Sequence, residues 1–209
     1  MRNILCYGDS NTWGFNPKTN GGRYEYHLRW TTVVQNLLKD KCRIIPEGLN
    51  SRTTAWDDPI RDGVNGKKYL LPCLLSHKPL DLVIIMLGTN DLKHRFNLSA
   101  FDISLGIGKL IDIVNKSECG PNGNNPEILI LIPPEVRLLT NYKNEFGDCH
   151  LKSKELAKCY IDICNEKSVN YMEIGNFVRL GDTDGIHFET NQLPILGKIV
   201  ADKIEQLLY

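Results

Sequence analysis

The sequence lacks an excess of charge of either sign, and this limits the partners it can be expected to have. Lys and Arg together number 25, as do Asp and Glu, so the formal net charge is zero. Without a basic excess, nucleic acid and anionic membranes are not expected partners. A neutral chain also has little electrostatic self-repulsion, so association between copies is not opposed, and a homo-oligomer stays open as an expectation.

Long apolar runs and paired cysteines are also missing. No stretch approaches the roughly 20 apolar residues that a membrane helix needs, and the apolar run at the N-terminus is too short for the core of a signal peptide. The seven cysteines are odd in number and include no Cys-x-x-Cys pair. This pattern argues against a disulfide framework and against a zinc site. We therefore expect a cytoplasmic protein with reduced cysteines.

Short apolar runs alternate with longer amphipathic stretches along the chain. The apolar runs predict strands at residues 2–7, 42–46, 80–87, 128–132 and 171–174. The amphipathic stretches predict helices at residues 28–39, 68–76, 99–115, 151–167 and 190–208. Unbroken apolar runs are typical of strands buried on both faces, so the pattern predicts a doubly wound parallel sheet. Because no repeat or linker divides the chain, we expect one domain over residues 1–209.

Polar segments follow three of the predicted strands, at the sheet edge where ligands of open parallel sheets bind. Gly8-Asp9-Ser10 follows the first strand, and the glycine lets the backbone bend sharply there. Residues 47–54 form a polar, glycine-containing segment after the second strand, and Gly88-Thr89-Asn90-Asp91 follows the third. Taken singly, each of these segments could equally be a turn or a helix cap with no functional role.

Asp184 and His187 lie three residues apart, just before the last predicted helix. Across one turn of chain the carboxylate reaches the near ring nitrogen, which fixes the tautomer and leaves the far nitrogen available as a base. Serine chemistry needs a nucleophile, a base, an orienting carboxylate and oxyanion donors, and the predicted sheet brings candidates for all four together. The G-x-S-x-G motif of an α/β-hydrolase and the G-x-G-x-x-G motif of a dinucleotide site are both absent.

Three of these segments resemble the sequence blocks of one enzyme family. Gly8-Asp9-Ser10, Gly88-Thr89-Asn90-Asp91 and Asp184-Gly185-Ile186-His187 resemble the first, third and fifth blocks of the SGNH (GDSL-like) hydrolases, and together they span nearly the whole chain. The amino-acid sequences of residues 10–14 and 88–93 are most similar to the bacterial arylesterase and acyltransferase branch of this family. With the strand–helix pattern, the resemblance implies an α/β fold: a three-layer α/β/α sandwich with a five-stranded parallel, flavodoxin-like sheet.

The resemblance also implies roles for individual residues. Ser10 would be the nucleophile, His187 the general base and acid, and Asp184 the carboxylate that orients the histidine. The oxyanion hole would combine the backbone N–H groups of Ser10 and Ser51 with the side chain of Asn90. The family commonly has glycine where Ser51 stands, so a neighbour of Ser51 is the alternative donor. The resemblance implies no metal and no cofactor.

Five residues near these motifs are expected to contact the substrate. Asp9 and Asn50 flank the proposed nucleophile and oxyanion donor. Trp13 either walls the acyl or alcohol pocket or belongs to the core, and Ile186 and Phe188 face either the pocket or the core. The remaining histidines have no acidic partner at metal-ligand spacing, so surface or packing roles are expected for His27, His77, His94 and His150. We interpret residues 93–95 as a solvated turn, with an anion-binding segment as the lower-ranked alternative.

The sequence thus predicts a serine esterase that acts on small esters, and it leaves open whether the enzyme also transfers acyl groups to alcohols. We expect a preference for short acyl groups, because the candidate cover at residues 135–150 is too polar to line a long acyl groove. Alternatives are a carbohydrate O-acetylesterase and, ranked lower, a lysophospholipase, a thioesterase or an inactive binding module. The intact set of Ser10, Asn90, Asp184 and His187 argues against an inactive module.

Overall fold

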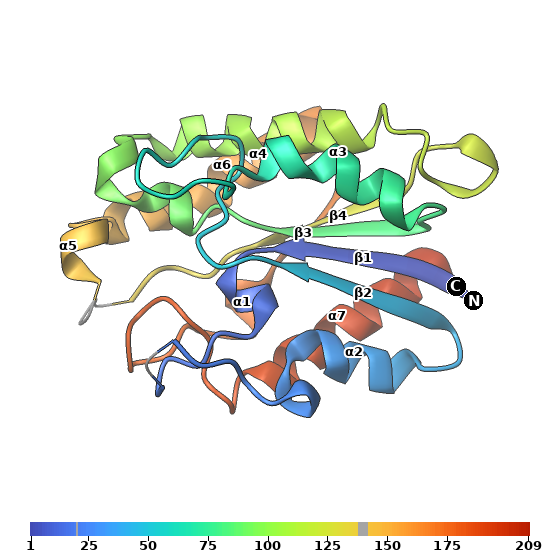
Figure 1. Ribbon diagram of the computed structural model, residues 1–209, viewed down its shortest axis with the longest axis horizontal. Coiled ribbons are helices and arrows are strands. Elements are labelled where there is room, and N and C mark those ends of the chain that lie inside the picture. The colour runs from blue at the N-terminus through green and yellow to red at the C-terminus, as the bar shows by residue number, and fades with distance from the viewer. Residues whose placement is uncertain (20, 138–141) are drawn as a thin grey trace.

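One parallel sheet of five strands forms the centre of the protein (Figure 1). The computed structural model describes residues 1–19, 21–137 and 142–209. The strands are β1 (Arg2–Gly8), β2 (Cys42–Gly48), β3 (Leu82–Met86), β4 (Glu127–Ile132) and β5 (Asn170–Glu173). Their order is β2-β1-β3-β4-β5, which is the flavodoxin-like order that we predicted.

Helices cover both faces of the sheet and give the predicted three layers (Figure 1). On one face α2 packs against α7, and on the other α4 packs against α3 and α6. The long helices are α2 (Trp30–Leu38), α3 (Gly66–His77), α4 (Ala100–Val114), α6 (His150–Glu166) and α7 (Leu193–Leu208). This arrangement confirms the predicted α/β/α sandwich.

Burial explains why the central strands were visible in the sequence. All five residues of β3 and all but the first of β4 are buried, as unbroken apolar runs predict. β5 lies at the edge of the sheet, and its four residues are only partly buried, which accounts for its weaker apolar run. The last helix begins at Leu193 rather than at residue 190, because the chain first makes a turn in which the Gln192 N–H donates to the Glu189 carbonyl.

Two helices of four residues each were not predicted: α1 (Ser10–Trp13) and α5 (Lys143–Phe146). A single turn is too short to show helical periodicity in the sequence. The second of them lies within residues 135–150, the segment that we expected to cover the site, and residues 138–141 lie outside the described residues. Among the described helices, none has both the length and the apolar character that crossing a membrane requires.

Candidate active site

Ser10 begins α1 directly after β1, at a turn that its neighbours hold in place. A Cβ atom on Gly8 would lie 2.1 Å from Oγ1 of Thr12, so glycine is required at this strand exit. The buried side chain of Asp9 caps α1 by accepting a hydrogen bond from the Asn11 N–H at 2.9 Å. Burial raises the pKa of Asp9 to about 6. The cap fixes the helical turn from which the Ser10 hydroxyl projects.

Two hydrogen bonds connect Ser10, His187 and Asp184. Oγ of Ser10 lies 2.8 Å from Nε2 of His187, and Nδ1 of His187 lies 2.6 Å from Oδ2 of Asp184. Both the histidine and the aspartate are buried, and Oδ1 of Asp184 also accepts hydrogen bonds from the N–H groups of Ile186 and His187. Burial opposes ionisation of Asp184, but the hydrogen bonds and charge of His187 outweigh it and lower the pKa of the carboxyl. An ionised carboxylate therefore holds the imidazole with Nε2 facing the serine.

Ser51 and Asn90 lie at the ends of the two strands that flank β1. Ser51 has a φ of 67°, a left-handed conformation that glycine adopts without strain, so the backbone here suits the glycine that the resemblance led us to expect at this position. Nδ2 of Asn90 donates to the Arg52 carbonyl at 3.2 Å and lies 3.5 Å from Oδ2 of Asp9. Among the described residues, we find no acceptor for the backbone N–H of Ser51.

Asp91 holds these two strand exits together. Its buried carboxylate accepts hydrogen bonds from the backbone N–H and the hydroxyl of Thr54. Burial raises the pKa of Asp91 to about 6, and the hydrogen bonds from Thr54 oppose this shift. The segment after β3, which carries Asn90, is thereby fixed to the segment after β2, which carries Ser51.

The sequence matches a family model over most of its length. The model of the GDSL-like Lipase/Acylhydrolase family matches residues 6–191. The chain belongs to this family. It is an ester-hydrolysing serine hydrolase, and the resemblance seen in its three sequence blocks is confirmed. No curated protein matches the sequence.

Solved structures of two esterases and of a lipase/acylhydrolase superpose on the whole chain. A carbohydrate acetylesterase from Sinorhizobium meliloti is 38% identical, with a TM-score of 0.95 and complete coverage of both chains. The native aryl esterase of M. smegmatis is 36% identical, with a TM-score of 0.96 and again complete coverage of both chains. A lipase/acylhydrolase from Enterococcus faecalis shares the fold at 18% identity and a TM-score of 0.72, covering 98% of that chain. The similar enzymes thus include both an aryl esterase and a carbohydrate acetylesterase.

In this GDSL-family chain a cavity of about 230 Å³ opens beside Ser10. Six of the residues singled out from the sequence line it: Ser10, Asn50, Ser51, Asn90, Ile186 and His187. The other lining residues are Phe15, Gly21, Arg61, Lys93, Tyr142, Glu145 and Phe146. A larger cavity of about 580 Å³ shares Arg61 with this one but contains none of the three hydrogen-bonded residues. We therefore take the smaller cavity as the candidate active site.

Three residues expected at the substrate do not line the 230 Å³ cavity, which corrects our expectation for Asp9, Trp13 and Phe188. Asp9 is used as the helix cap. Trp13 lies at the other end of α1, where the guanidinium of Arg23 sits 4.6 Å from the centre of its ring. Phe188 is 2% exposed and belongs to the core.

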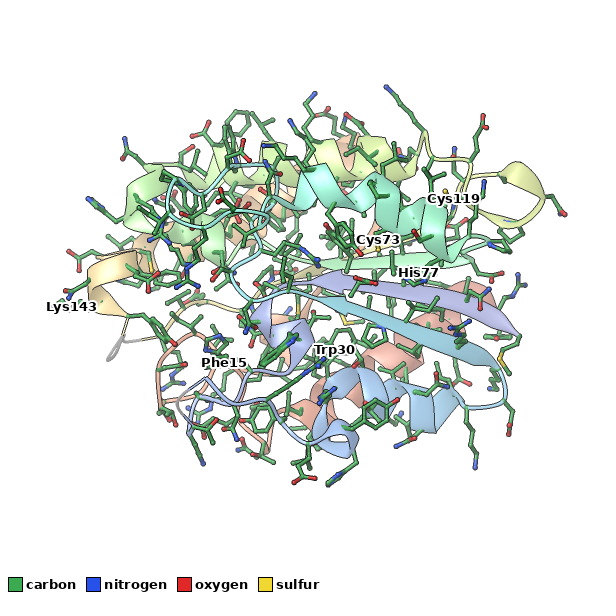
Figure 2. All side chains as sticks on the ribbon, in the orientation of Figure 1. Phe15, Trp30, Cys73, His77, Cys119 and Lys143 are labelled. Carbon is green, nitrogen blue, oxygen red and sulfur yellow. The ribbon has the colours of Figure 1, made fainter. Side chains whose placement is uncertain are left out.

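Phe15, and not Trp13, lines the cavity beside α1. Its ring stacks on the imidazole with centroids 4.2 Å apart and an interplanar angle of 28°. Gly14 ends α1 with a φ of 94° and so reverses the chain (Figure 2 labels Phe15 below α1). Because that turn follows the helix directly, Trp13 faces away and Phe15 returns to the site. The sequence signal was the glycine after Trp13, which marks a helix end.

Of residues 93–95, which we expected to form a solvated turn, only His94 is exposed. Lys93 is 3% exposed, lines the cavity, and has its Nζ 3.5 Å from Oε2 of Glu145. Burial lowers the pKa of Lys93. Arg95 makes a bidentate pair with the buried Asp58, at 3.0 and 2.9 Å. Nothing in the sequence around Lys93 indicated its burial, because the residues that cover it belong to α5.

Proposed function

We propose that Ser10, His187 and Asp184 perform ester hydrolysis as nucleophile, base and orienting carboxylate. The two hydrogen bonds that connect them, at 2.8 and 2.6 Å, support this proposal most directly. Oγ of Ser10 attacks the ester carbonyl while Nε2 of His187 takes the hydroxyl proton. His187 returns that proton to the leaving alcohol, and an acyl-Ser10 remains. Water then releases the acid, whereas a second alcohol in its place gives acyl transfer.

The developing oxyanion is stabilised by the backbone N–H groups of Ser10 and Ser51 and by Nδ2 of Asn90. Ser51 is preferred to its neighbour Arg52 because the Arg52 N–H is already bound to the Leu49 carbonyl at 3.1 Å. Ser51 and Asn90 both line the cavity with Ser10. The fixed segments that carry them need no reorganisation as charge develops, which is what makes such donors effective.

Replacing Asn90 by Ala is expected to lower kcat by roughly 10² to 10³, because one oxyanion donor is lost. KM should change little, since the donor acts on charge that appears only in the transition state. Steady-state kinetics on p-nitrophenyl acetate measure both parameters. A rise in KM with unchanged kcat would mean that Asn90 only binds the ester, and the proposed oxyanion hole would lose its third donor.

The walls of the cavity favour a small acyl group. Its volume of about 230 Å³ lies below the usual range of pockets for drug-sized ligands, about 300–1,000 Å³. Phe15 and Phe146 give it apolar surface, but Arg61, Lys93 and Glu145 also line it. An extended fatty chain would have to pass these charged groups, and burying them against hydrocarbon is costly.

We expect kcat/KM to be highest for acetate to about butyrate esters and to fall beyond them. Each added CH2 gains up to roughly 0.8 kcal/mol if it is buried, but steric exclusion removes this gain once the cavity is full. A p-nitrophenyl ester series from acetate to palmitate measures the profile. A steady increase in kcat/KM beyond octanoate would contradict the short-acyl proposal and favour a lipase.

An acetylated carbohydrate is the second candidate substrate, and Asn50 favours it. Oδ1 of Asn50 is buried and has no hydrogen-bond partner among the described residues, although the residue lines the cavity. A buried acceptor without a partner is costly unless a ligand donates to it, and sugar hydroxyls are suitable donors. The similarity to the S. meliloti carbohydrate acetylesterase is consistent with this candidate.

Replacing Asn50 by Ala separates the two candidates. If a sugar hydroxyl binds Asn50, kcat/KM on acetylated sugars should fall about three- to tenfold, which corresponds to one hydrogen bond. The value on p-nitrophenyl acetate should stay unchanged, because that ester has no hydroxyl group. Equal values for wild type and variant on acetylated sugars would remove the support that Asn50 gives to a carbohydrate substrate.

A further inference from the structure

Glu47, Cys73 and His77 form a cluster outside the active-site cavity. One ligand atom from each residue lies within 4.8 Å of the other two. Glu47 lies near the end of β2, whereas Cys73 and His77 lie one turn apart on α3 and project from the same side of the helix (Figure 2). This cluster could not be predicted from the sequence, because Glu47, the acidic partner of His77, lies 30 residues earlier in the chain.

The three side chains already interact in part. Nε2 of His77 lies 3.0 Å from Oε1 of Glu47. The Cys73 side chain is buried, and no hydrogen bond of its thiol is found among the described residues. Burial and the neighbouring charge of Glu47 raise the pKa of Cys73 to about 12, so the thiol is protonated at neutral pH. The Cys73 sulfur, a His77 nitrogen and a Glu47 carboxylate oxygen therefore lie close together. The nitrogen and the oxygen are hydrogen-bonded to each other, and the sulfur has no hydrogen bond among the described residues.

We propose that this cluster binds Zn²⁺ through Sγ of Cys73, Nε2 of His77 and a carboxylate oxygen of Glu47. Cysteine, histidine and glutamate are the ligand types that Zn²⁺ takes in proteins, and three of them leave the fourth tetrahedral position for water. Bond lengths of about 2.0–2.3 Å require ligand atoms roughly 3.4–3.6 Å apart. Side-chain adjustment of about 1 Å brings atoms within 4.8 Å to that spacing.

The charges at the cluster suit a dication. Binding displaces the Cys73 proton to solvent, so the thiolate and the Glu47 carboxylate carry two negative charges that neutralise Zn²⁺. Arg52 is a cation beside the cluster and opposes the rise in the pKa of Cys73; its guanidinium donates to the Gly8 and Glu47 carbonyls and lies over the Tyr7 ring at 4.1 Å. These contacts fix Arg52 in place, so its charge weakens Zn²⁺ binding without blocking the ligand atoms.

An ion can reach the cluster from the larger cavity. Glu47 lines this cavity of about 580 Å³, and the Glu47 and His77 side chains are 23% and 28% exposed. None of the three ligands lines the active-site cavity. The ion would connect α3 to the end of β2, the strand that leads to Ser51, so it is expected to stabilise the fold and take no part in the ester reaction.

Binding of Zn²⁺ and Co²⁺ to tag-free, chelator-treated protein tests the proposal. Equilibrium dialysis with Zn²⁺ alone should show one tight site per chain, and Zn²⁺ should raise the Tm by mass action. Co²⁺ at the same site should give a thiolate-to-cobalt charge-transfer band in the near ultraviolet. Because none of these readouts uses ester turnover, the Zn²⁺ site and the proposed serine mechanism succeed or fail separately.

Matched cysteine variants show whether Cys73 is the thiolate ligand. Cys73→Ser should weaken Zn²⁺ binding by at least about 100-fold and remove the cobalt band. Cys164→Ser is the control, because Cys164 is another buried thiol whose pKa burial raises to about 12, and it should leave both readouts unchanged. If Cys73→Ser does not fold, His77→Gln, at a partly exposed position, should weaken binding to a similar degree. No saturable Zn²⁺ binding, a cobalt spectrum without the thiolate band, or unchanged affinity in these variants would overturn the proposal.

Discussion

Replacing Ser10 by Ala is expected to lower kcat by roughly 10⁶, the loss seen when the nucleophile of a serine hydrolase is removed. His187 would then have no hydroxyl to deprotonate, and no acyl-enzyme could form. The side chain of Ser10 makes one hydrogen bond, to Nε2 of His187. Its removal should therefore cost about 0.5–1.5 kcal/mol of unfolding free energy at most, and the variant should stay folded.

A buried serine away from the site provides the control for this variant. Ser117 is 8% exposed, against 7% for Ser10, and its hydroxyl donates to the Val114 carbonyl at 2.8 Å. Ser117→Ala removes this hydrogen bond and the one that the hydroxyl accepts from the Cys119 N–H at 3.3 Å, but it should leave kcat unchanged. Turnover on p-nitrophenyl acetate and thermal unfolding of both variants give the comparison. Retained activity in Ser10→Ala would show that another residue is the nucleophile.

Replacing Asp184 by Asn is expected to lower kcat by about 10⁴, the cost of the wrong histidine tautomer in a serine protease. The carboxylate accepts the proton of Nδ1 at 2.6 Å, and an amide NH2 in its place would donate to that nitrogen instead. The far nitrogen would then carry the proton and could not serve as a base for Ser10. The amide oxygen can still accept from the N–H groups of Ile186 and His187, so the loop should hold its shape.

Asp182→Asn is the matched control for the Asp184 variant. Asp182 lies two residues earlier in the same loop, is largely exposed, and pairs with Arg137 at 2.7 Å. Its replacement should leave kcat unchanged, since exposed ion pairs contribute little. Steady-state kinetics of both variants decide the matter. A loss of less than about tenfold in Asp184→Asn, with the fold intact, would mean that Asp184 does not orient the base.

The fold could be predicted because its signals are local. β3 and β4 are buried along nearly their whole length, so their residues had to be apolar without interruption. The sheet then placed the segments after β1, β2 and β3 at one edge, where Ser10, Ser51 and Asn90 line one cavity. Asp184 and His187 were visible because they are neighbours in the chain.

The walls of the cavity could not be predicted, because they depend on contacts between distant segments. Phe15 reaches His187 after a left-handed turn at Gly14, whereas the larger Trp13 is turned away. Lys93 is buried by its position beside Glu145 and Phe146 of α5, a single helical turn without periodicity. The pairing of His77 with Glu47 likewise arises from α3 lying beside β2, which no spacing in the sequence reveals.

Covalent labelling with a serine-directed phosphonate tests the central claim most directly. The reagent is attacked by the nucleophile and leaves a stable adduct that peptide mass spectrometry locates. Ser10 and Ser51 both line the cavity, so the reagent has access to two serine hydroxyls. We predict one adduct per chain, on the peptide that contains Ser10, and no adduct in Ser10→Ala. An adduct on Ser51, or labelling that persists in Ser10→Ala, would contradict the assignment of Ser10 as the nucleophile.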